Sequence, residues 1–588
     1  MNQNAAPLNA NILLRTKIWF AIIFAVIAIF IIRLFYLQVI QHANYKQQAL
    51  IGQLKEYEIE PTRGTIYAMN GSEKVPIVLN EPRFTLFADP LFIKDSNSAA
   101  EQIEKQIGGN VTEYKEKMEA DSRYQILAKK LTADQAESIN NLELKGVGTR
   151  EVSIRIYPQG TLSSQVLGFV NDENIGKYGI EEFYNEELRG KPGRLKAITD
   201  ANGVPLVANE DNVIEKPEDG SDVVLTIDIP LQSQVEEIIK KHVKKTKANT
   251  GSAIVIDVNT GAVKAMANYP TYDPAKYYEV EDGNLFNNNA VSYPTEVGSI
   301  MKPLTTAAAL EYGDVTKTSG YFDPGFFIVD DAKISNVEEI GGAAQRTVPD
   351  ILSMSLNTGA TWLLMQMGGG EINQKARQKW YDFMTKHYRF GQETGIEQGF
   401  ESPGKIPDPN EGYGLNITYA NTAFGQASLI TPIQIAAADS AILNGGTYYR
   451  PRLVENTISS SGEEKEIGPE VLLDDVVGDN VSKDIQDMME NVVTINYIAY
   501  GFDSLPENYR IGGKSGTAEV AKPEGGYYTD RFNGTYTGWV GGDKPQYLVV
   551  VSLDKPVVQG YAGSRAAAPV FVDISQILIN NFNVRPRS

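Results

Sequence analysis

The chain has no cysteine and only three histidines, His42, His242 and His387, among its 588 residues. The absence of cysteine excludes disulfide bonds, thiolate nucleophiles and cysteine-ligated metals together. Three histidines are too few for a histidine-rich metal site, and they leave few candidates for a Ser-His-Asp triad. We therefore expect no metal and no cofactor, and lysine is the better candidate base for any serine nucleophile.

Positive charge is also scarce. The chain carries 54 lysines and arginines against 74 aspartates and glutamates, a net charge of −20, and it contains no block of basic residues. A nucleic-acid partner is therefore not expected. The length is sufficient for several domains, each with its own core.

The only long hydrophobic run covers residues 18–32 and continues past Arg33 to residue 40. A helix over residues 18–40 reaches the ~20 residues that span a bilayer, and Arg33 near one end can extend its charge to the interface. A secretory signal peptide is the alternative, but the run is long and no small-x-small cleavage site follows it. Because two basic residues flank the amino side, we expect a cytoplasmic tail at residues 1–17, a single span in the cytoplasmic membrane and an extracytoplasmic remainder.

Residues 41–215 predict a mixed α/β domain without catalytic spacing. An extended segment from Glu58 to Tyr67 leads to a hairpin turn at Asn70-Gly71, and the amphipathic stretch 97–144 predicts helices. Residues 203–222, rich in proline, glycine and acids, predict a linker. We expect this domain to act as a spacer or to bind a partner protein.

Residues 216–588 place strands at both ends and helices between them. We expect a strand at 223–229, a helix at 230–247, a hairpin turning at Asn259–Gly261, a helix-rich middle to about 445, strands at 510–518, 536–540 and 546–553, and a closing helix at 566–581. This order predicts one sheet assembled from both ends of the domain, with helices on its faces.

The segment Glu296–Pro303 opens an Ala/Leu-rich helix, and Gly298 suits a tight turn into it. Ser299 and Lys302 then lie on one face of the first helical turn. A desolvated lysine can take the proton of the serine hydroxyl, and unpaired N–H groups at a helix start favour a developing oxyanion. Because Ser-x-x-Lys also occurs by chance, the alternative is a helix cap beside a solvated lysine.

Two further short motifs follow in the same domain. The first is Ser355-Leu356-Asn357, and the second is Lys514-Ser515-Gly516-Thr517 on a strand-like segment. Taken singly, the first is typical of a helix end or turn, and the second of a strand that leaves a bend. When the three motifs occur in this order, in one domain behind a membrane helix, their combination is a specific signal that the single motifs do not give.

From the membrane helix onward, the chain closely resembles the penicillin-binding transpeptidases of the high-molecular-weight class B. Besides the three motifs, the resemblance includes Arg63–Ile66, Gly179–Tyr184, Leu188–Gly190, Thr394–Ile396 and Ala566–Phe571. The departures are modest, because Val297 stands where proline is usual and Ser515 stands where threonine is commoner. Neither departure removes a catalytic group.

The resemblance implies an α+β multidomain fold with an N-terminal transmembrane helix. An extended mixed α/β pedestal of the dimerisation type would occupy residues 41–215. A penicillin-binding transpeptidase domain would occupy residues 216–588, with an antiparallel five-stranded sheet flanked by helices and an all-helical region.

The resemblance also implies the catalytic residues. Ser299 would attack the carbonyl between the two terminal D-alanines of a peptidoglycan stem peptide and release D-alanine. Lys302, kept neutral by burial and a nearby cation, would take the serine proton. Ser355 and Lys514 would relay that proton to the leaving amine, while Asn357 would hold Lys302 and the substrate amide.

The third motif is implied to bind substrate through Ser515, Gly516 and Thr517, with the two hydroxyls near the terminal carboxylate. The N–H groups of Ser299 and Thr517 would form the oxyanion hole, and the strand would pair with the extended peptide. An amine of a neighbouring stem peptide would complete the cross-link. β-Lactams would acylate Ser299.

Other classes of acyl-serine protein are the alternatives. A β-lactamase or carboxypeptidase would admit water, but Glu411–Asn416 is one residue too long for the water-activating Glu-x-x-Leu-Asn pattern. A penicillin sensor would need signalling machinery across the membrane, for which residues 1–17 are too short. A bifunctional class A protein would carry a glycosyltransferase domain, which we do not find in the sequence.

The family implies a SEDS-type membrane glycosyltransferase and other division or elongation proteins as partners, with a lipid-linked precursor as source of the stem peptide. Tyr157-Pro158 followed by Gly168–Asn171 favours the septal branch over the elongation branch. Residues 521–533, beside the third motif, predict an exposed loop, with substrate contact as the alternative.

Overall fold

The computed structural model describes residues 10–42, 44–45, 54–198, 213–337, 342–502, 505–523 and 525–588. The chain divides into two compact units. The first unit comprises Met1–Pro61 and Lys191–Glu218, and the second comprises Thr62–Gly190 and Asp219–Ser588.

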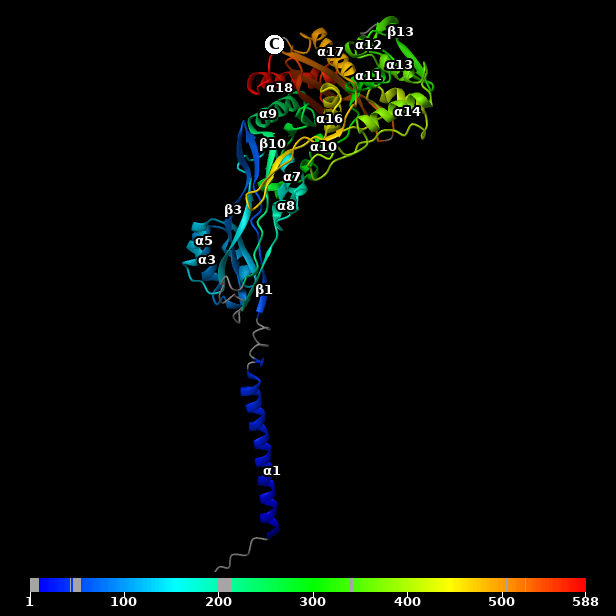
Figure 1. Cartoon of the computed structure of the whole chain (residues 1–588). Coiled ribbons are helices and arrows are strands. Elements are labelled where there is room, and N and C mark those ends of the chain that lie inside the picture. The colour runs from blue at the N-terminus through cyan, green and yellow to red at the C-terminus, as the bar shows by residue number, and fades with distance from the viewer. Residues whose placement is uncertain are drawn as a thin grey trace, which may run out of the picture. The chain divides into compact units, whose positions relative to one another are not determined.

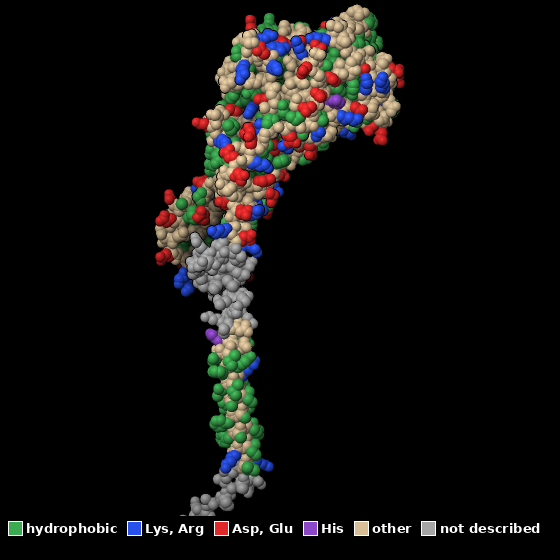
Figure 2. Space-filling view, in the orientation of Figure 1, with side chains coloured by type: hydrophobic (Ala, Val, Ile, Leu, Met, Phe, Trp, Pro, Cys, Tyr) green, Lys and Arg blue, Asp and Glu red, His purple; other side chains and the backbone are tan. Residues whose placement is uncertain are grey.

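The first unit contains the apolar helix α1 (Ala10–Phe35), which continues as a π-helical turn at Tyr36–Ile40 (Figure 1). Within it, Leu14–Ile40 is long and apolar enough to cross a membrane, and none of its most apolar stretch is buried. Figure 2 shows hydrophobic side chains along this helix. Such a surface is stable in lipid and not in water. Of the expected cytoplasmic tail, residues 1–9 lie outside the described residues, and the rest belongs to α1.

The first unit also contains an antiparallel sheet of β1 (Leu54–Ile59), β8 (Gly193–Ile198) and β9 (Val213–Glu215). The expected linker at 203–222 lies partly outside the described residues. Its described part is not all loop, because Val213–Glu215 pairs with β8.

The pedestal part of the second unit is built on β2 (Ile66–Asn70) and the long β3 (Glu73–Ala88), which turn at the expected Asn70-Gly71. β3 pairs with β4 (Gln125–Leu131) and β5 (Val147–Ile156), and the helices α3 (Ser96–Ile107), α4 (Val111–Met118) and α5 (Ala133–Asn140) pack beside them. The prediction of helices throughout 97–144 is therefore wrong at β4. Its Ala, Lys and Leu residues favour helix locally, but pairing with β3 overrides that preference.

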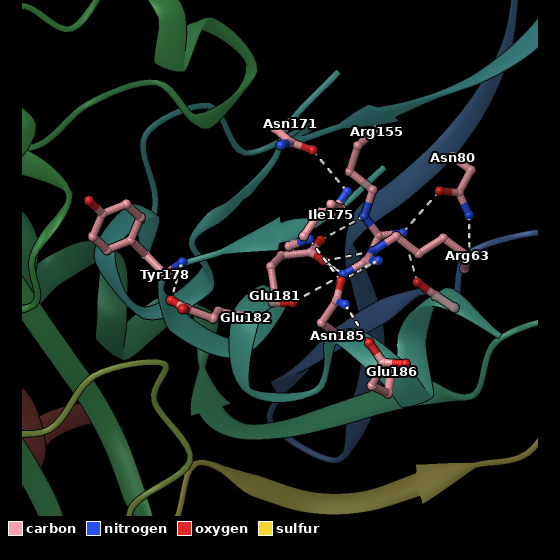
Figure 3. Close-up of polar contacts among 12 residues, drawn as sticks. Arg63, Asn80, Arg155, Asn171, Ile175, Tyr178, Glu181, Glu182, Asn185 and Glu186 are labelled. Atoms are coloured by element: carbon pink, nitrogen blue, oxygen red, sulfur yellow. Dashed lines mark hydrogen bonds and ion pairs between the residues drawn. The ribbon is translucent and has the colours of Figure 1, made fainter. Parts of the chain in front are cut away.

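A buried ionic network joins distant segments of the pedestal, including α7 (Gly179–Phe183) and α8 (Asn185–Arg189) (Figure 3). Arg63 donates to Glu181 Oε2 from Nε at 2.8 Å and from Nη2 at 2.6 Å. Arg155 Nε donates to Glu181 Oε1 at 2.7 Å. Arg155 Nη1 also donates to the Gly64 carbonyl and to Asn80 Oδ1. Arg63–Ile66 and Gly179–Tyr184, two segments that carry the family resemblance, are therefore joined at the fully buried carboxylate of Glu181.

The transpeptidase part contains a five-stranded antiparallel sheet in the order β12-β11-β23-β22-β21. The strands are β11 (Thr250–Asp257), β12 (Val263–Tyr269), β21 (Arg510–Ala521), β22 (Tyr527–Gly541) and β23 (Pro545–Asp554). The first two come from the start of the domain and the last three from its end, as predicted. The Asn259–Gly261 hairpin is confirmed.

Helices cover both faces of this sheet because alternate strand residues point to opposite sides. Ala253 and Val255 share a core with α9 (Ile229–Thr246) and α18 (Ala568–Asn581). Ile254 and Ile256 belong to the other core, together with α16 (Pro432–Leu443). The α9 helix begins where the Asp228 side chain accepts a hydrogen bond from Leu231 N, a capping arrangement that favours a helix start.

The middle of the domain is rich in helices, as expected, and also holds two small strand pairs. Its helices are α11 (Met301–Glu311), α12 (Val348–Ser353), α13 (Asn357–Met367), α14 (Gln374–Asp382), α15 (Leu415–Thr422) and, after α16, α17 (Asp479–Ile495). The pairs are β13 (Gly320–Asp323) with β16 (Ala344–Thr347), and β14 (Phe326–Val329) with β15 (Ala332–Ser335). These pairs were not predicted from the sequence.

Short elements complete the second unit. They are α6 (Ser164–Leu167), β6 (Phe169–Val170), β7 (Gly176–Lys177), β10 (Asp222–Asp228), α10 (Asn289–Ser292), β17 (Tyr448–Tyr449), β18 (Val454–Ile458), β19 (Glu464–Glu466) and β20 (Val471–Leu473). The strand β10 pairs with β2 of the pedestal and with β18 of the transpeptidase part, so the two parts share hydrogen-bonded strands.

Candidate active site

Ser299 lies in a single 3₁₀ turn, Gly298–Ile300, that leads directly into α11. Gly298 has a φ of 63°, and a Cβ there would lie 2.6 Å from the carbonyl oxygen of Thr517. Only glycine accepts both this backbone conformation and this close approach. The predicted tight turn is therefore confirmed, and it places Ser299 against the strand of the third motif.

Lys302 is fully buried one turn after Ser299. Its Nζ lies 2.8 Å from Ser299 Oγ, 3.1 Å from Ser355 Oγ and 2.9 Å from Asn357 Oδ1. Burial lowers the pKa of the Lys302 ammonium well below its usual value, and the neighbouring charge of Lys514 lowers it further. The alternative of a helix cap beside a solvated lysine is inconsistent with this geometry.

Ser355 lies between the two lysines of the site. Its Oγ is 3.1 Å from Lys302 Nζ and 3.0 Å from Lys514 Nζ. Its φ of 57° is uncommon for a residue other than glycine. Such a conformation persists where the surrounding structure imposes it, which is frequent at functional sites. Here the fully buried Leu356 anchors the next position.

Asn357 is the first residue of α13. Its Oδ1 faces Lys302, and its Nδ2 donates to the carbonyl of Ser335 at 3.2 Å. The strand pair that contains Ser335, unforeseen from sequence, therefore supports this side chain from outside the motif.

Lys514 lies on β21 with only 2% of its surface exposed. Burial lowers its pKa to about 7. Ser515 and Thr517 alternate with it along the strand and are partly exposed. A Cβ at Gly516 would lie 2.6 Å from the carbonyl oxygen of Val297, so glycine lets the strand approach the Ser299 turn.

The strand β21 forms one edge of the sheet, and its described pairing is with β22. An edge strand leaves alternate N–H and C=O groups open to a further extended chain. Thr517 Oγ1 accepts a hydrogen bond from Gly563 N at 3.0 Å, which fixes this residue beside the open edge.

The five predicted catalytic residues therefore lie in one continuous set of contacts, and the three predicted substrate-binding residues follow Lys514 on β21. Within the described residues, no carboxylate forms an ion pair with either buried lysine; their polar contacts are to hydroxyl, amide and carbonyl oxygens. Glu411 is exposed, and Asn416 instead contacts Asp330 and Arg377.

The stretch 521–533 is mostly not a loop, because β22 begins at Tyr527. Tyr527 donates from its hydroxyl to Glu296 Oε1 at 2.8 Å, and Ala427 N donates to the same oxygen at 2.7 Å. This contact ties the β21–β22 hairpin to the residues before Ser299. The Gly525-Gly526 pair between two strand-like stretches is a sequence signal from which this hairpin could have been predicted.

Two family models match the chain. The model described as Penicillin-binding Protein dimerisation domain matches residues 58–225, and the one described as Penicillin binding protein transpeptidase domain matches residues 251–576, more than half of the chain.

Among curated proteins, the chain is 32% identical to Stage V sporulation protein D of Bacillus subtilis, over 98% of this chain and 88% of that protein. It is 26% identical to Peptidoglycan D,D-transpeptidase FtsI of Escherichia coli, over 94% of this chain and 89% of that protein.

Solved structures share the fold. Penicillin Binding Protein 2X of Streptococcus thermophilus superposes with a TM-score of 0.73 at 21% identity, covering 90% of this chain and 80% of that one. Penicillin binding protein 3 of Mycobacterium tuberculosis, complexed with aztreonam, superposes with a TM-score of 0.68 at 23% identity. The match covers 90% of this chain and 98% of that one. With its dimerisation and transpeptidase domains in this order behind an apolar helix, the chain belongs to the class B penicillin-binding proteins.

Proposed function

We propose that this protein is a peptidoglycan D,D-transpeptidase that cross-links stem peptides through an acyl-enzyme on Ser299. The observation that carries the proposal is the unbroken contact set from Ser299 through Lys302 and Ser355 to Lys514. It joins a hydroxyl nucleophile to a buried amine with a lowered pKa, which is what a serine needs for activation.

In the acylation step, neutral Lys302 takes the proton of Ser299 as its Oγ attacks the carbonyl between the terminal D-alanines. The oxyanion accepts hydrogen bonds from the N–H groups of Ser299 and Thr517, each worth about 3–4 kcal/mol in such sites. The proton then passes by way of Ser355 and Lys514 to the leaving nitrogen. The carbon–nitrogen bond breaks, the ester with Ser299 forms, and D-alanine leaves with a free amino group.

The third motif would bind the end of the donor peptide. The hydroxyls of Ser515 and Thr517, with the charge of Lys514, suit a terminal carboxylate. The open edge of β21 can pair with an extended peptide backbone, while Asn357 holds the substrate amide.

The acyl-enzyme would be resolved by an amine of a neighbouring stem peptide. That nitrogen displaces Ser299 Oγ, and the proton returns to the serine through Lys302. Because Glu411 lies on the surface and not in the site, we expect slow hydrolysis and long-lived β-lactam adducts. This favours a transpeptidase over a β-lactamase.

The helix α1 would anchor the protein in the cytoplasmic membrane, with residues 1–17 in the cytoplasm and the catalytic domain outside. We place the pedestal at residues 41–215 and the transpeptidase domain at 216–588. A SEDS-type glycosyltransferase is the proposed polymerising partner. The septal role is favoured over elongation on the basis of Tyr157-Pro158 and Gly168–Asn171.

The proposal is tested by labelling the full-length protein in detergent with a fluorescent penicillin. The Ser299→Ala variant should lose covalent labelling completely, whereas the matched control Ser292→Ala, a nearby serine outside the contact set, should retain it. Labelling of Ser299→Ala at another serine would refute the assignment. Rapid steady hydrolysis of penicillin by the wild type would place the protein among the hydrolases.

A further inference from the structure

A cavity of about 590 Å³ lies at one end of the five-stranded sheet, outside the contacts of Ser299. Its lining includes Thr250 at the start of β11, Asn268 near the end of β12 and Asp554 at the end of β23. The remaining wall comes mainly from residues 282–293, which include the short helix α10.

A small pocket of about 10 Å³ adjoins this cavity on the side towards the active site. The two share Thr250, Asn289, Tyr293 and Asp554, and the smaller one adds Thr295 and Asn533. Thr295 precedes Ser299 by four residues, and Asn533 pairs with Ala518, the residue after Thr517. Since neighbouring strands are about 4.8 Å apart, the path from β21 to β11 covers about 14 Å along the sheet end. A chain attached to Ser299 would have to cover this distance over the sheet end to reach the cavity.

Side-chain amides that make no hydrogen bond to another described residue line part of the larger cavity. The side chains of Asn284, Asn287 and Asn289 line it and make no hydrogen bond to another described residue. Asn268 is 7% exposed; its Nδ2 donates to Asn288, but its Oδ1 is buried without a partner among the described residues. Each amide offers both a donor and an acceptor, so the wall suits a ligand with many neutral polar groups.

The charged groups of the cavity are already engaged. Asp282 accepts from the backbone N–H of Asn284, and Asp554 accepts from Asn249 and from Lys555. No lysine or arginine is among the described residues that line it, so it does not suit a phosphate or carboxylate. At the wall, Tyr293 and Phe400 are 47% and 60% exposed and offer aromatic surfaces.

We propose that this cavity binds N-acetylated sugars of the glycan strand that carries the donor stem peptide, a proposal that rests on the transpeptidase function of Ser299. Hydroxyl and acetamido groups are neutral donors and acceptors, which the amides of Asn284, Asn287 and Asn289 match. The aromatic faces of Tyr293 and Phe400 match the apolar face of a sugar ring. The cavity thus holds the glycan while the peptide reaches Ser299.

The test titrates full-length protein in detergent with tetra-N-acetylchitotetraose, a peptide-free N-acetylated oligosaccharide, by calorimetry. The wild type should bind it saturably. The variants Asn284→Ala/Asn287→Ala and Phe400→Ala should each weaken binding about tenfold, through lost amide hydrogen bonds or aromatic packing. Tyr413→Ala, a fully exposed aromatic outside the cavity, is the matched control and should bind as the wild type does. Cellotetraose, which lacks acetamido groups, should bind about tenfold more weakly than the N-acetylated sugar.

Acylation by fluorescent penicillin is measured on the same samples and reports both folding and the Ser299 function. It should be unchanged in the cavity variants, while KM rises for a glycan-linked donor and stays constant for a short thioester donor. Unacylated wild type would refute the transpeptidase assignment itself. Three results, each with normal acylation, would overturn only the glycan site. They are no binding of the sugar, sugar binding that the variants do not change, and displacement of the sugar by free stem peptide.

Discussion

Two buried clusters of cations in this protein differ in the type of cation and in the presence of a carboxylate. In the pedestal, Arg63 and Arg155 enclose Glu181, whose side chain is fully buried. In the transpeptidase domain, Lys302 and Lys514 meet at Ser355, and no carboxylate among the described residues pairs with either. Both clusters join segments far apart in the chain, and in the second one burial lowers the pKa of Lys514 to about 7.

The difference follows from the side chains. Arginine keeps its proton in proteins and binds a carboxylate with a planar fork, so the pedestal cluster is a fixed structural joint. Lysine loses its proton more readily when buried. Burial of the second cluster therefore lowers the stability of the fold but supplies a reactive, neutral amine. The buried arginines paired with a carboxylate stabilise the fold. The buried lysine pair, which has no carboxylate partner among the described residues, is suited to proton transfer.

The largest expected effect comes from removing the proposed base. Lys302→Met keeps the side-chain volume but cannot accept a proton, so the rate of Ser299 acylation should fall about 10³- to 10⁴-fold. The thermal unfolding temperature should stay the same or rise, because the variant removes a buried amine that has no carboxylate partner among the described residues. The two readouts are stopped-flow penicillin acylation and calorimetry. An acylation rate within tenfold of the wild type would separate Lys302 from the chemistry.

Glu181→Gln should give the reverse pattern. Two arginines would then remain buried without a counter-charge, which lowers the free energy of unfolding by about 3–5 kcal/mol. The acylation rate per folded molecule should not change. Denaturant unfolding of the full-length protein measures the first quantity and active-site titration the second; the neighbouring Glu186→Gln, at the exposed edge of the network, serves as control. Unchanged stability would show that the pedestal cluster is not a structural joint.

Ser355→Ala should have a smaller effect on acylation than Lys302→Met. It removes the hydroxyl between the two amines but leaves both in place, so a decrease of about 10²-fold is expected. The acylation should become less dependent on Lys514, so that a second substitution, Lys514→Met, adds less than it does alone. Simple additivity in this double-mutant cycle would contradict a relay through Ser355.

The pH dependence of acylation should be bell-shaped. At low pH Lys302 is protonated and cannot accept the serine proton, so the rate rises as pH passes its lowered pKa. Above about 7, Lys514 loses its charge and with it the attraction for the substrate carboxylate, so the rate falls. The second-order rate constant for acylation, measured from acid to alkaline pH, tests both the rising and the falling limb of the profile. In Lys302→Met the rising limb should vanish; its persistence would assign it to another group.

The smallest expected effect concerns the hairpin contact. Tyr527→Phe removes the hydrogen bond to Glu296 and should lower the free energy of unfolding by about 1 kcal/mol. Acylation should slow only severalfold, because the contact supports the turn before Ser299 without touching the reacting atoms. Tyr528→Phe on the same hairpin is the control. A loss comparable with that of Ser355→Ala would instead place Tyr527 among the catalytic residues.

The parts of the site that depend on local geometry could be predicted from sequence. The turn at Gly298 and the spacing of Ser299 and Lys302 follow from helix geometry over a few residues. The approach of Ser355 and Lys514 does not, since 159 positions separate them; that expectation came from family resemblance.

Contacts across long separations were the ones missed. Arg63 and Glu181 are 118 positions apart, and neither position looks unusual in its own segment. The strand β4 has helix-forming composition and is a strand only because β3 lies beside it. Tyr527 and Glu296, 231 positions apart, meet only once the sheet is assembled. Such contacts depend on tertiary packing, which local propensity does not encode.

We propose that a neutral Lys302 activates Ser299 at a site where no carboxylate among the described residues pairs with the lysine. Peptide mapping by mass spectrometry, after brief incubation of full-length wild type and Lys302→Met with benzylpenicillin, tests it most directly. The account predicts one penicilloyl adduct on the peptide containing Ser299 in the wild type and almost none in the variant at the same time. An adduct on a different serine, or equal adduct in both proteins, would contradict it.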